Sequence, residues 1–399
     1  MKPPMIRFHH SWDSEGNFVG AKLGSSYVDF YFPHGLMVNL DDINACKAAA
    51  YSVLATLTLA APSISLADRY TGGKPKSAEP LHSYIWLIQD YLGNGLYQAT
   101  SQLLARDQRG KINWKSTFHT QALINDDIPF YLTPVIEKST REDTIITEIQ
   151  KYCLGIATHK IGWLYNFNYS TPIEPTNPSR ELYYENILLK KLQITYNDHH
   201  KLLLQHLLRI VRLSRGQTTT RERTEIGTYD YDHVWEQMIQ SVYGNLPLHE
   251  YFPTTTWFLN GTERLNKSLR PDTVMKLDNT LYILDAKYYT YGIAPGGSGS
   301  LPSSDSIQKQ ITYGDHAKLY HPEYSQVISA FIVPFTATSD LIEYAGYATS
   351  DWRSETSSHQ RIHLLLLDTA YLIKQYLASN NSTALRTELI NPLKIANFQ

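Results

Sequence analysis

The sequence predicts a mixed α/β fold, with a central sheet flanked by helices in the C-terminal half and an α+β region before it. From residue 226 onward, the hydrophobic pattern gives the order helix, hairpin, helix, strand, strand, helix. Residues 326–335 and 361–367 are apolar runs of strand length, and residues 369–377 have the pattern of a closing helix. Helices that cover both faces of one sheet are a common way to bury such strands.

The secondary structure of the region before residue 226 is predicted from its hydrophobic periodicity and its turn residues. Residues 5–35 alternate polar and apolar side chains, which predicts antiparallel strands. Asp41 and Asp42 are expected to cap an alanine-rich helix that ends near Thr58, before a loop over residues 59–79. Further helices are expected over 81–91, after Gly95, over 141–154 and over 180–215 with a break near Asn197, and strands over 114–132.

Two short motifs in the C-terminal half contain residues of the kinds that enzymes use in catalysis. Asp272 closes an Arg-Pro-Asp run, and Asp285 and Lys287 bracket an alanine. Residues 273–276 and 281–288 are predicted as the two strands of a hairpin, joined by an Asp-Asn-Thr turn. Because side chains alternate faces along a strand, Asp285 and Lys287 share one face, and Asp272 can meet them across the hairpin.

These residue types fit a metal-dependent phosphodiesterase. Hard divalent cations such as Mg²⁺ take oxygen ligands, which Asp272 and Asp285 would supply. A bound cation lowers the pKa of a coordinated water and neutralises charge that develops on phosphoryl oxygens. Lys287 would orient that water or stabilise its hydroxide form.

The alternative is a surface hairpin whose aspartate and lysine form an exposed ion pair of little energetic value. The apolar residues 281–284 argue against it, because a strand of this composition is expected to be buried. A charged pair on a buried strand requires compensation. The hydrolytic centre is therefore the preferred interpretation.

Polar residues on the neighbouring predicted helices extend this candidate centre. Glu236 lies in a helix over residues 231–239 and could reach the metal as a ligand or a base, or could be a solvated helix position. Gln310 and Tyr313 share one face of a later helix that opens at Ser304 or Asp305. They could hydrogen-bond the lysine region or a DNA phosphate, or could close the core around the hairpin.

Together these motifs resemble a known group of enzymes. A helix glutamate, Arg-Pro-Asp, Leu-Asp-Ala-Lys-Tyr-Tyr and Ser-Asp-x-x-x-Lys-Gln-x-x-Tyr resemble the PD-(D/E)xK nuclease superfamily. Within it, the chain is most similar to the LlaJI-type restriction endonucleases and the McrC nuclease subunits. The likeness is specific over about residues 226–375, where Ile226-Gly227-Thr228 is itself typical of the LlaJI type. A weaker likeness covers residues 110–117 and 153–163.

The resemblance implies a restriction-endonuclease-like core that cleaves double-stranded DNA in restriction-modification and phage defence. It implies one or two Mg²⁺ ions in each active site, for which Mn²⁺ would substitute. The implied metal site comprises Asp272, Asp285, Glu236 and Ala286, the implied catalytic residues are Asp272, Asp285, Lys287, Glu236 and Gln310, and Tyr313 and Asp305 support them.

The resemblance also implies a partner, an AAA+ GTPase of the McrB kind that recognises DNA and translocates. This sequence has no Gly-x-x-x-x-Gly-Lys-Ser/Thr phosphate loop, so any nucleotide hydrolysis must come from that partner. Two alternatives stay open: a self-sufficient type II restriction endonuclease that reads its own site, and a non-catalytic DNA-binding or assembly subunit. A homodimer is open as well.

Basic residues are concentrated just before the candidate centre. Such a cluster could follow a phosphate backbone, or could be a solvated helix face with a basic loop. The candidate DNA contacts are Lys190, Lys191, Arg209, Arg212, Arg215, Arg221 and Arg223, with Lys309 farther along.

Length and composition fit a cytoplasmic enzyme. The 399 residues allow more than one domain, and their net charge of −2 argues against a wholesale polyanion binder. Two cysteines are too few for a disulfide framework. No signal peptide and no apolar window of membrane-spanning length are expected.

Three parts are expected along the chain. Residues 1–170 would form an α+β domain for DNA recognition or partner docking, and residues 171–225 a linker with a basic helical segment. Residues 226–399 would form the nuclease domain. The prolines at 172, 175 and 178 mark the linker.

Overall fold

The computed structural model divides the chain into two compact units. Unit 1 is formed by Met1–Ala78 together with Arg221–Gln399, and unit 2 by Glu79–Thr220. The residues that the structure describes are 5–10, 17–24, 27–71, 81–106, 111–125, 128–165, 177–216, 224–293, 300–351 and 360–396.

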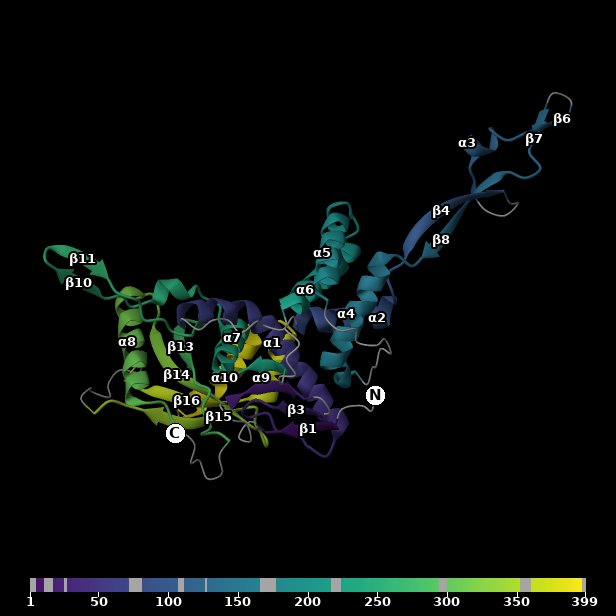
Figure 1. Cartoon of the computed structure of the whole chain (residues 1–399). Coiled ribbons are helices and arrows are strands. Elements are labelled where there is room, and N and C mark those ends of the chain that lie inside the picture. Colours follow the sequence, from purple (N-terminus) through teal and green to yellow (C-terminus); the bar gives the residue numbers. More distant parts are fainter. Residues whose placement is uncertain are drawn as a thin grey trace. The chain divides into compact units, whose positions relative to one another are not determined.

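A five-stranded mixed sheet forms the centre of unit 1 (Figure 1). Its strands are β12 (Thr273–Leu277), β13 (Thr280–Ala286), β14 (Gln326–Phe335), β15 (Ile342–Ala348) and β16 (Ile362–Asp368). In the order β12-β13-β14-β16-β15, the three middle strands run parallel and the two edge strands run antiparallel to their neighbours. Asp278 turns the chain between β12 and β13 with φ 55°, a left-handed conformation that aspartate tolerates.

Four helices accompany this sheet. They are α7 (Tyr231–Tyr243), α8 (Ser304–Tyr320), α9 (Thr369–Leu377) and α10 (Thr383–Ala396). Ile311 of α8 packs against Phe331 and Ile362 of the sheet. Trp235 of α7 is completely buried and donates its Nε1–H to the carbonyl of Ile332 at 3.2 Å. The mixed α/β class predicted for this part of the chain is confirmed.

A short hairpin lies between α7 and the central sheet in sequence. It consists of β10 (Thr256–Leu259) and β11 (Thr262–Leu265), which pair antiparallel. A 3-10 helix, η4 (Leu248–Tyr251), precedes it. The sequence interpretation did not include this hairpin, strand β15 or helix α10.

A second sheet joins the N-terminal residues to those just before α7. Its strands are β1 (Met5–His9), β2 (Val19–Leu23), β3 (Tyr27–Tyr31) and β9 (Thr224–Thr228) in the order β1-β3-β2-β9. The antiparallel pairing predicted within residues 5–35 is correct for β2 and β3 but wrong for β1, which runs parallel to β3. Gly227 of β9 faces Gly20 of β2, and a Cβ on Gly227 would lie 2.2 Å from the carbonyl oxygen of Val19. The two glycines therefore permit a close approach of these strands.

The segment after β3 ties the N-terminal residues to the central sheet. The hydroxyls of Thr369 and Thr336 donate to the carbonyls of His34 and Gly35, at 2.8 and 3.0 Å. The backbone N–H of His34 donates to the hydroxyl of Tyr288 at 2.6 Å. Gly35 has φ +76° and lies so close to the side chain of Thr369 that no larger residue fits.

The division expected near residue 225 lies close to the unit boundary at Thr220 and Arg221, whereas the division expected near residue 170 has no counterpart and a boundary falls at Ala78 and Glu79 instead. Residues 1–78 fold with the C-terminal part because β2 pairs with β9 and the segment after β3 packs on the central sheet. Both connections join residues far apart in sequence, so no pattern within a short stretch of the sequence predicts either of them.

Helix α1 (Ile43–Thr71) contacts α7 and α9 in unit 1. It continues past the end predicted near Thr58, into residues that were expected to form a loop. By length and composition, its part Ile43–Ala60 would suffice to cross a membrane, which corrects the expectation that no such window exists. Ala50, Val53 and Leu54 on this helix are completely buried within the protein, as in a core helix.

Unit 2 contains a group of helices. These are α2 (Leu81–Asn94), α4 (Ile145–Ile161), the 3-10 helix η3 (Gly162–Leu164), α5 (Pro178–Gln193) and α6 (Asp198–Gly216). The break predicted near Asn197 is confirmed, since its side chain accepts the backbone N–H of His200 at 2.9 Å at the start of α6. Leu203, Leu207 and Val211 form the predicted buried stripe of α6. Both cysteines of the chain are free and buried, as expected.

A long β-ribbon, to which the short strand β5 (Lys111–Ile112) adds beside β8 (Val135–Glu142), completes unit 2. It pairs β4 (Ala99–Arg106) with β8, and β5, α3 (Trp114–Thr117), β6 (Leu123–Asn125) and β7 (Ile128–Phe130) lie between them in sequence. The helix expected after Gly95 is therefore wrong, because this segment pairs with a strand some thirty residues later. The strands and turn expected over residues 114–132 are confirmed in part by the pairing of β6 with β7.

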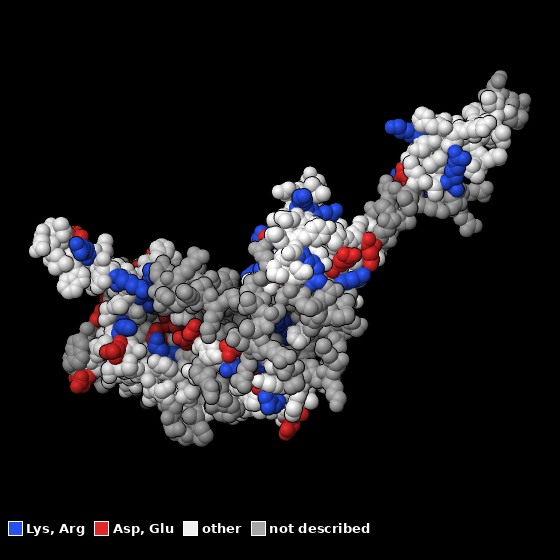
Figure 2. All heavy atoms as spheres, in the orientation of Figure 1, with Lys and Arg blue, Asp and Glu red and all other residues white. Residues whose placement is uncertain are grey.

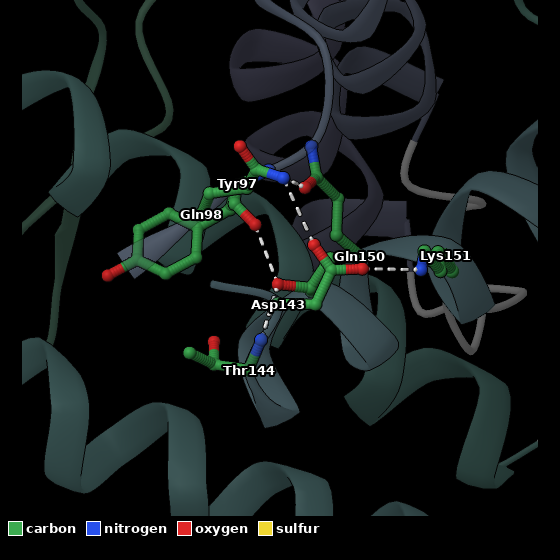
Figure 3. Close-up of polar contacts among 7 residues, drawn as sticks. Tyr97, Gln98, Asp143, Thr144, Gln150 and Lys151 are labelled. Carbon is green, nitrogen blue, oxygen red and sulfur yellow. Dashed lines mark hydrogen bonds and ion pairs between the residues drawn. The ribbon is translucent and has the colours of Figure 1, made fainter. Parts of the chain in front are cut away.

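A polar network fixes the base of the ribbon to α4 (Figure 3). The backbone N–H of Tyr97 donates to Oε1 of Gln150 at 2.6 Å, and the Tyr97 carbonyl accepts from the hydroxyl of Thr147 at 2.6 Å. Asp143 pairs with Lys151 at 3.0 Å. Gln150 is completely buried, so the ribbon starts from a fixed point on α4.

Candidate active site

Asp272 and Asp285 come together at the edge of the five-stranded sheet. Thr273 pairs with Leu284 in the β12–β13 register, so the preceding residue, Asp272, lies opposite Asp285. The backbone N–H of Ala286 donates to Oδ2 of Asp272 at 2.8 Å and holds this carboxylate in place. The meeting of the two aspartates across a hairpin, expected from the sequence, is present in the structure.

Lys287 joins this pair from the end of β13. Its Nζ lies 2.8 Å from Oδ2 of Asp285, and both side chains are largely buried, with 21% and 12% exposed. Burial alone would lower the pKa of Lys287, but the carboxylates of Asp285 and Asp272 raise it above its ordinary value overall. Lys287 is therefore a fixed positive charge at neutral pH and has no capacity to accept a proton there.

The electrostatics of Asp272 show how closely the acidic groups are gathered. Burial raises the pKa of Asp272 well above its usual range, and the negative charges of Asp285 and Glu236 raise it further. Lys287 opposes this effect only in part. The site thus contains more negative charge than its own cation neutralises.

Glu236 approaches this centre from α7. It is half-buried, and its Oε2 lies 3.4 Å from Nδ1 of His233, whose pKa its hydrogen bond raises to about 9. In the described part of the chain, no three His, Cys, Asp or Glu side chains are arranged so that they could hold one metal ion. In this structure, Glu236 contributes charge to the site while pairing with a protonated histidine.

Helix α8 brings Tyr313 and Gln310 to the same region. The hydroxyl of Tyr313 donates to the carbonyl of Arg270 at 3.0 Å, and burial with the charges of Asp285 and Asp272 raises its pKa. Gln310, one turn away on the same helix, is completely buried, and neither polar atom of its amide has a hydrogen-bond partner among the residues that the structure describes. A buried amide without partners is costly, and such groups gather at sites that bind something polar.

Asp305 and Lys309, two other residues of α8 that were expected to act at the site, are exposed. The predicted cap is displaced by one residue, because Ser303 takes the N-cap position and its side chain makes no capping bond.

Most of the predicted basic cluster, Lys190, Lys191, Arg209, Arg212 and Arg215, belongs to unit 2, whereas Arg221, Arg223 and the two aspartates belong to unit 1. Lys190 and Arg209 are exposed, and Lys191 is half-buried. Arg212 is paired with Glu185 at 2.7 Å. Arg221 and Arg223 lie outside the described residues, and so does the side chain of Arg215.

The β10–β11 hairpin carries basic and aromatic residues that sequence reasoning overlooked. It ends at a turn with Asn260 and Gly261, a pair that strongly favours a two-residue hairpin. Its side chains include Trp257 and Arg264, both exposed. The Asn-Gly pair between two short β-prone runs was the signal that would have found it.

Comparison with known proteins places these observations in a family. A family model described as LlaJI restriction endonuclease matches residues 74–356. No curated protein matches the chain. Among solved structures, the chain is similar to one from a half-complex of Thermococcus gammatolerans McrB AAA+ hexamers with bound McrC, at 14% identity and a TM-score of 0.36, covering 91% of this chain and 81% of that chain.

Proposed function

This chain belongs to the LlaJI restriction endonuclease family, and from that membership we propose that it is an Mg²⁺-dependent endonuclease that hydrolyses phosphodiester bonds of double-stranded DNA in restriction-modification and phage defence. Its active site is centred on Asp272, Asp285 and Lys287. The central sheet of unit 1 with α7 and α8 is, in this proposal, a PD-(D/E)xK core.

The observation that carries the proposal is the meeting of two buried or half-buried aspartates with a lysine at one sheet edge. Asp285 is 9% exposed and Asp272 is half-buried. The positive charge of Lys287 compensates the charge of these two carboxyl groups only in part. Such an arrangement is costly in a protein that gains nothing from it. A role as a purely structural assembly subunit gives no reason for this charge.

The donor set fits a hard divalent cation. Carboxylate oxygens are the ligands that Mg²⁺ and Mn²⁺ prefer, and a cation held by Asp272 and Asp285 would offset the burial and the carboxylate repulsion that raise the pKa of Asp272. Glu236 is paired with His233 in this structure, so its side chain would have to turn to join Asp272, Asp285 and the Ala286 position around one or two ions. A bound cation would activate a water molecule and stabilise charge on the scissile phosphate.

Lys287, Gln310 and Tyr313 would perform the other functions of the site. Lys287 carries a permanent positive charge, so we assign it the stabilisation of the attacking oxygen or the phosphate. The amide of Gln310 is buried without a partner in the described part of the chain, and it would donate to a phosphate oxygen or hold Lys287 in place. Tyr313 would fix the backbone before Asp272 through its bond to Arg270.

We further propose that cleavage depends on an AAA+ partner, which unit 2 would contact. Around and beyond the ribbon, unit 2 exposes large apolar side chains of a kind that proteins usually bury in an interface. They are Leu104, Trp114, Phe118, Leu123, Ile124, Phe130 and Leu132. The alternative is a self-sufficient type II enzyme, in which unit 2 would read the DNA sequence with the basic residues of α5 and α6.

Plasmid cleavage by the purified chain with Mg²⁺, alone and together with an AAA+ GTPase of the McrB kind, beside the Asp285→Ala variant, tests this function. Asp340→Ala serves as the matched control, because Asp340 is an exposed aspartate of the same unit with no role assigned at the site. With the AAA+ protein present, we expect cleavage by wild type and Asp340→Ala, and a loss of at least about 100-fold for Asp285→Ala. Retained cutting by Asp285→Ala would remove the metal-site assignment.

The same assay separates the two arrangements. Discrete, Asp285-dependent fragments from the chain alone would identify a self-sufficient restriction endonuclease. A folded chain that does not cut alone, but cuts after addition of an AAA+ GTPase of the McrB kind, would identify the partner-dependent enzyme. No cutting in either case would favour the non-catalytic subunit.

A further inference from the structure

The β10–β11 hairpin is exposed along its whole length. All eight residues of its two strands are exposed. Trp257 is 60%, Phe258 73% and Leu265 78% exposed. A two-stranded ribbon without a covering layer is marginally stable, so its apolar side chains require a partner that covers them.

The geometry of the hairpin makes it a stiff projection. Asn260 and Gly261 both adopt positive φ, 49° and 76°, which is the two-residue turn that matches the twist of paired strands. At the other end, the backbone N–H of Asn266 donates to the Thr255 carbonyl at 2.8 Å, and that of Leu269 donates to Pro253 at 3.0 Å. Backbone hydrogen bonds therefore continue past the ends of β10 and β11, and they hold the base of the hairpin (residues 253–255 and 266–269) in place.

That base adjoins the candidate active site. Leu269 packs on the core cluster that contains Tyr313 and Ile283. Asp272 follows three residues later, and the intervening Arg270 accepts the hydrogen bond from Tyr313. The chain from Leu265 to Asp272 spans at most about 25 Å even when fully extended. This length is roughly the width of a DNA duplex, so one duplex can lie against both the hairpin and Asp272.

The register gives the hairpin two different faces. Trp257 lies opposite Arg264, and Leu259 lies opposite Thr262, so these four side chains share one face. This is called the tryptophan face below. On the other face, Phe258 lies opposite Glu263.

Charge on and around the hairpin favours a polyanion. Between residues 253 and 271, the chain has three cations, Arg264, Lys267 and Arg270, and one anion, Glu263. All four side chains are exposed, and Figure 2 shows lysine and arginine side chains on the hairpin and at its base. The single carboxylate lies on the face opposite Trp257 and Arg264.

We propose that the β10–β11 hairpin enters a groove of duplex DNA beside the scissile phosphate, with its tryptophan face against the DNA. This inference rests on the proposed nuclease function and names a DNA-contacting element of that site. The major groove of B-DNA, about 12 Å wide, admits a two-stranded β-ribbon. Arg264 binds a phosphate, and Trp257 packs against a sugar or the edge of a base.

Binding of a fluorescein-labelled DNA duplex, measured by anisotropy in Ca²⁺ to prevent cleavage, tests this proposal. The variants Trp257→Ala and Arg264→Ala change the tryptophan face, and Phe258→Ala and Glu263→Gln are matched changes on the opposite face. We expect Trp257→Ala and Arg264→Ala to weaken binding at least about fivefold, with the controls near wild type. Arg264→Ala should also reduce the slope of log Kd against log salt by about 1.

Three outcomes would overturn the proposal. They are equal losses from both faces, unchanged binding for all four variants, and wild-type protein that does not bind the duplex. A change of oligomeric state in Trp257→Ala, seen by light scattering with DNA binding unchanged, would instead assign the hairpin to a second copy of the chain. Asp285-dependent cleavage measured in parallel shows whether the nuclease function itself holds, so the two failures are distinguishable.

Discussion

The carboxyl group of Asp272 lies where its charge is costly, and this makes its effect on stability measurable. Its pKa is raised in the folded protein, so between its unfolded value and the raised value the folded state binds more protons than the unfolded state. The free energy of unfolding that Asp272 contributes is therefore fully present at low pH and is lost as pH rises through this window. A bound divalent cation would offset the loss.

Asp272→Asn should therefore stabilise the metal-free protein while it abolishes cleavage. Asparagine retains an oxygen for the N–H of Ala286 but carries no charge. We expect a gain on the order of 1 kcal/mol at neutral pH, shrinking as pH falls toward about 4. Urea unfolding in chelator across this range measures it, with the exposed turn residue Asp278→Asn as control. A variant less stable than wild type at neutral pH would contradict this account of Asp272.

At the scale of elements, the base of the ribbon depends on one buried amide. Gln150 is the acceptor for the N–H of Tyr97, and its Nε2 also approaches the Gly95 carbonyl at 3.4 Å. Gln150→Leu should leave that N–H without a partner and destabilise the ribbon locally by about 1–3 kcal/mol. Hydrogen exchange over residues 97–106 should accelerate, with no change in the central sheet of unit 1.

The neighbouring glutamine provides a control for this prediction. Gln98 donates to Asp143 at 3.2 Å in an exposed contact. Gln98→Leu is expected to change exchange little, because water replaces the lost bond. Equal acceleration in both variants would mean that the network in Figure 3 does not fix the ribbon.

The elements that the sequence predicted are those defined by local signals. Helix α7, strands β12, β13, β14 and β16, and helices α8 and α9 all have apolar periodicity or turn residues within one stretch of chain. The candidate site followed from them, because the register of one short hairpin suffices to bring Asp272 and Asp285 together.

The features that sequence reasoning missed depend on distant partners or on unused signals. Strand β1 pairs parallel with β3, and Gly227 requires Gly20 opposite it, neither of which a local pattern reveals. Strand β15 is only partly buried, so it lacks the apolar run that identified β14. The hairpin at Asn260 was detectable from its turn pair. The roles of Glu236 and Gln310 remain predictions.

At the scale of the whole molecule, unit 2 is an insertion within unit 1. In the described residues, all three sheets of unit 1 are built from its own two stretches of chain. Unit 1 should therefore fold when residues 79–220 are replaced by a flexible glycine–serine linker. A single cooperative unfolding transition and a native near-UV spectrum would support this. A molten or insoluble product would show that unit 1 requires unit 2.

Because unit 1 consists of two separate stretches of chain, its two parts are translated at different times. While the ribosome is adding the residues of unit 2, on the order of 10 s of translation, β2 has no β9 to pair with. The two aspartates are synthesised later still, after β9 and α7. The candidate site therefore cannot assemble until translation has passed Lys287, and products that end before Asp272 lack both aspartates.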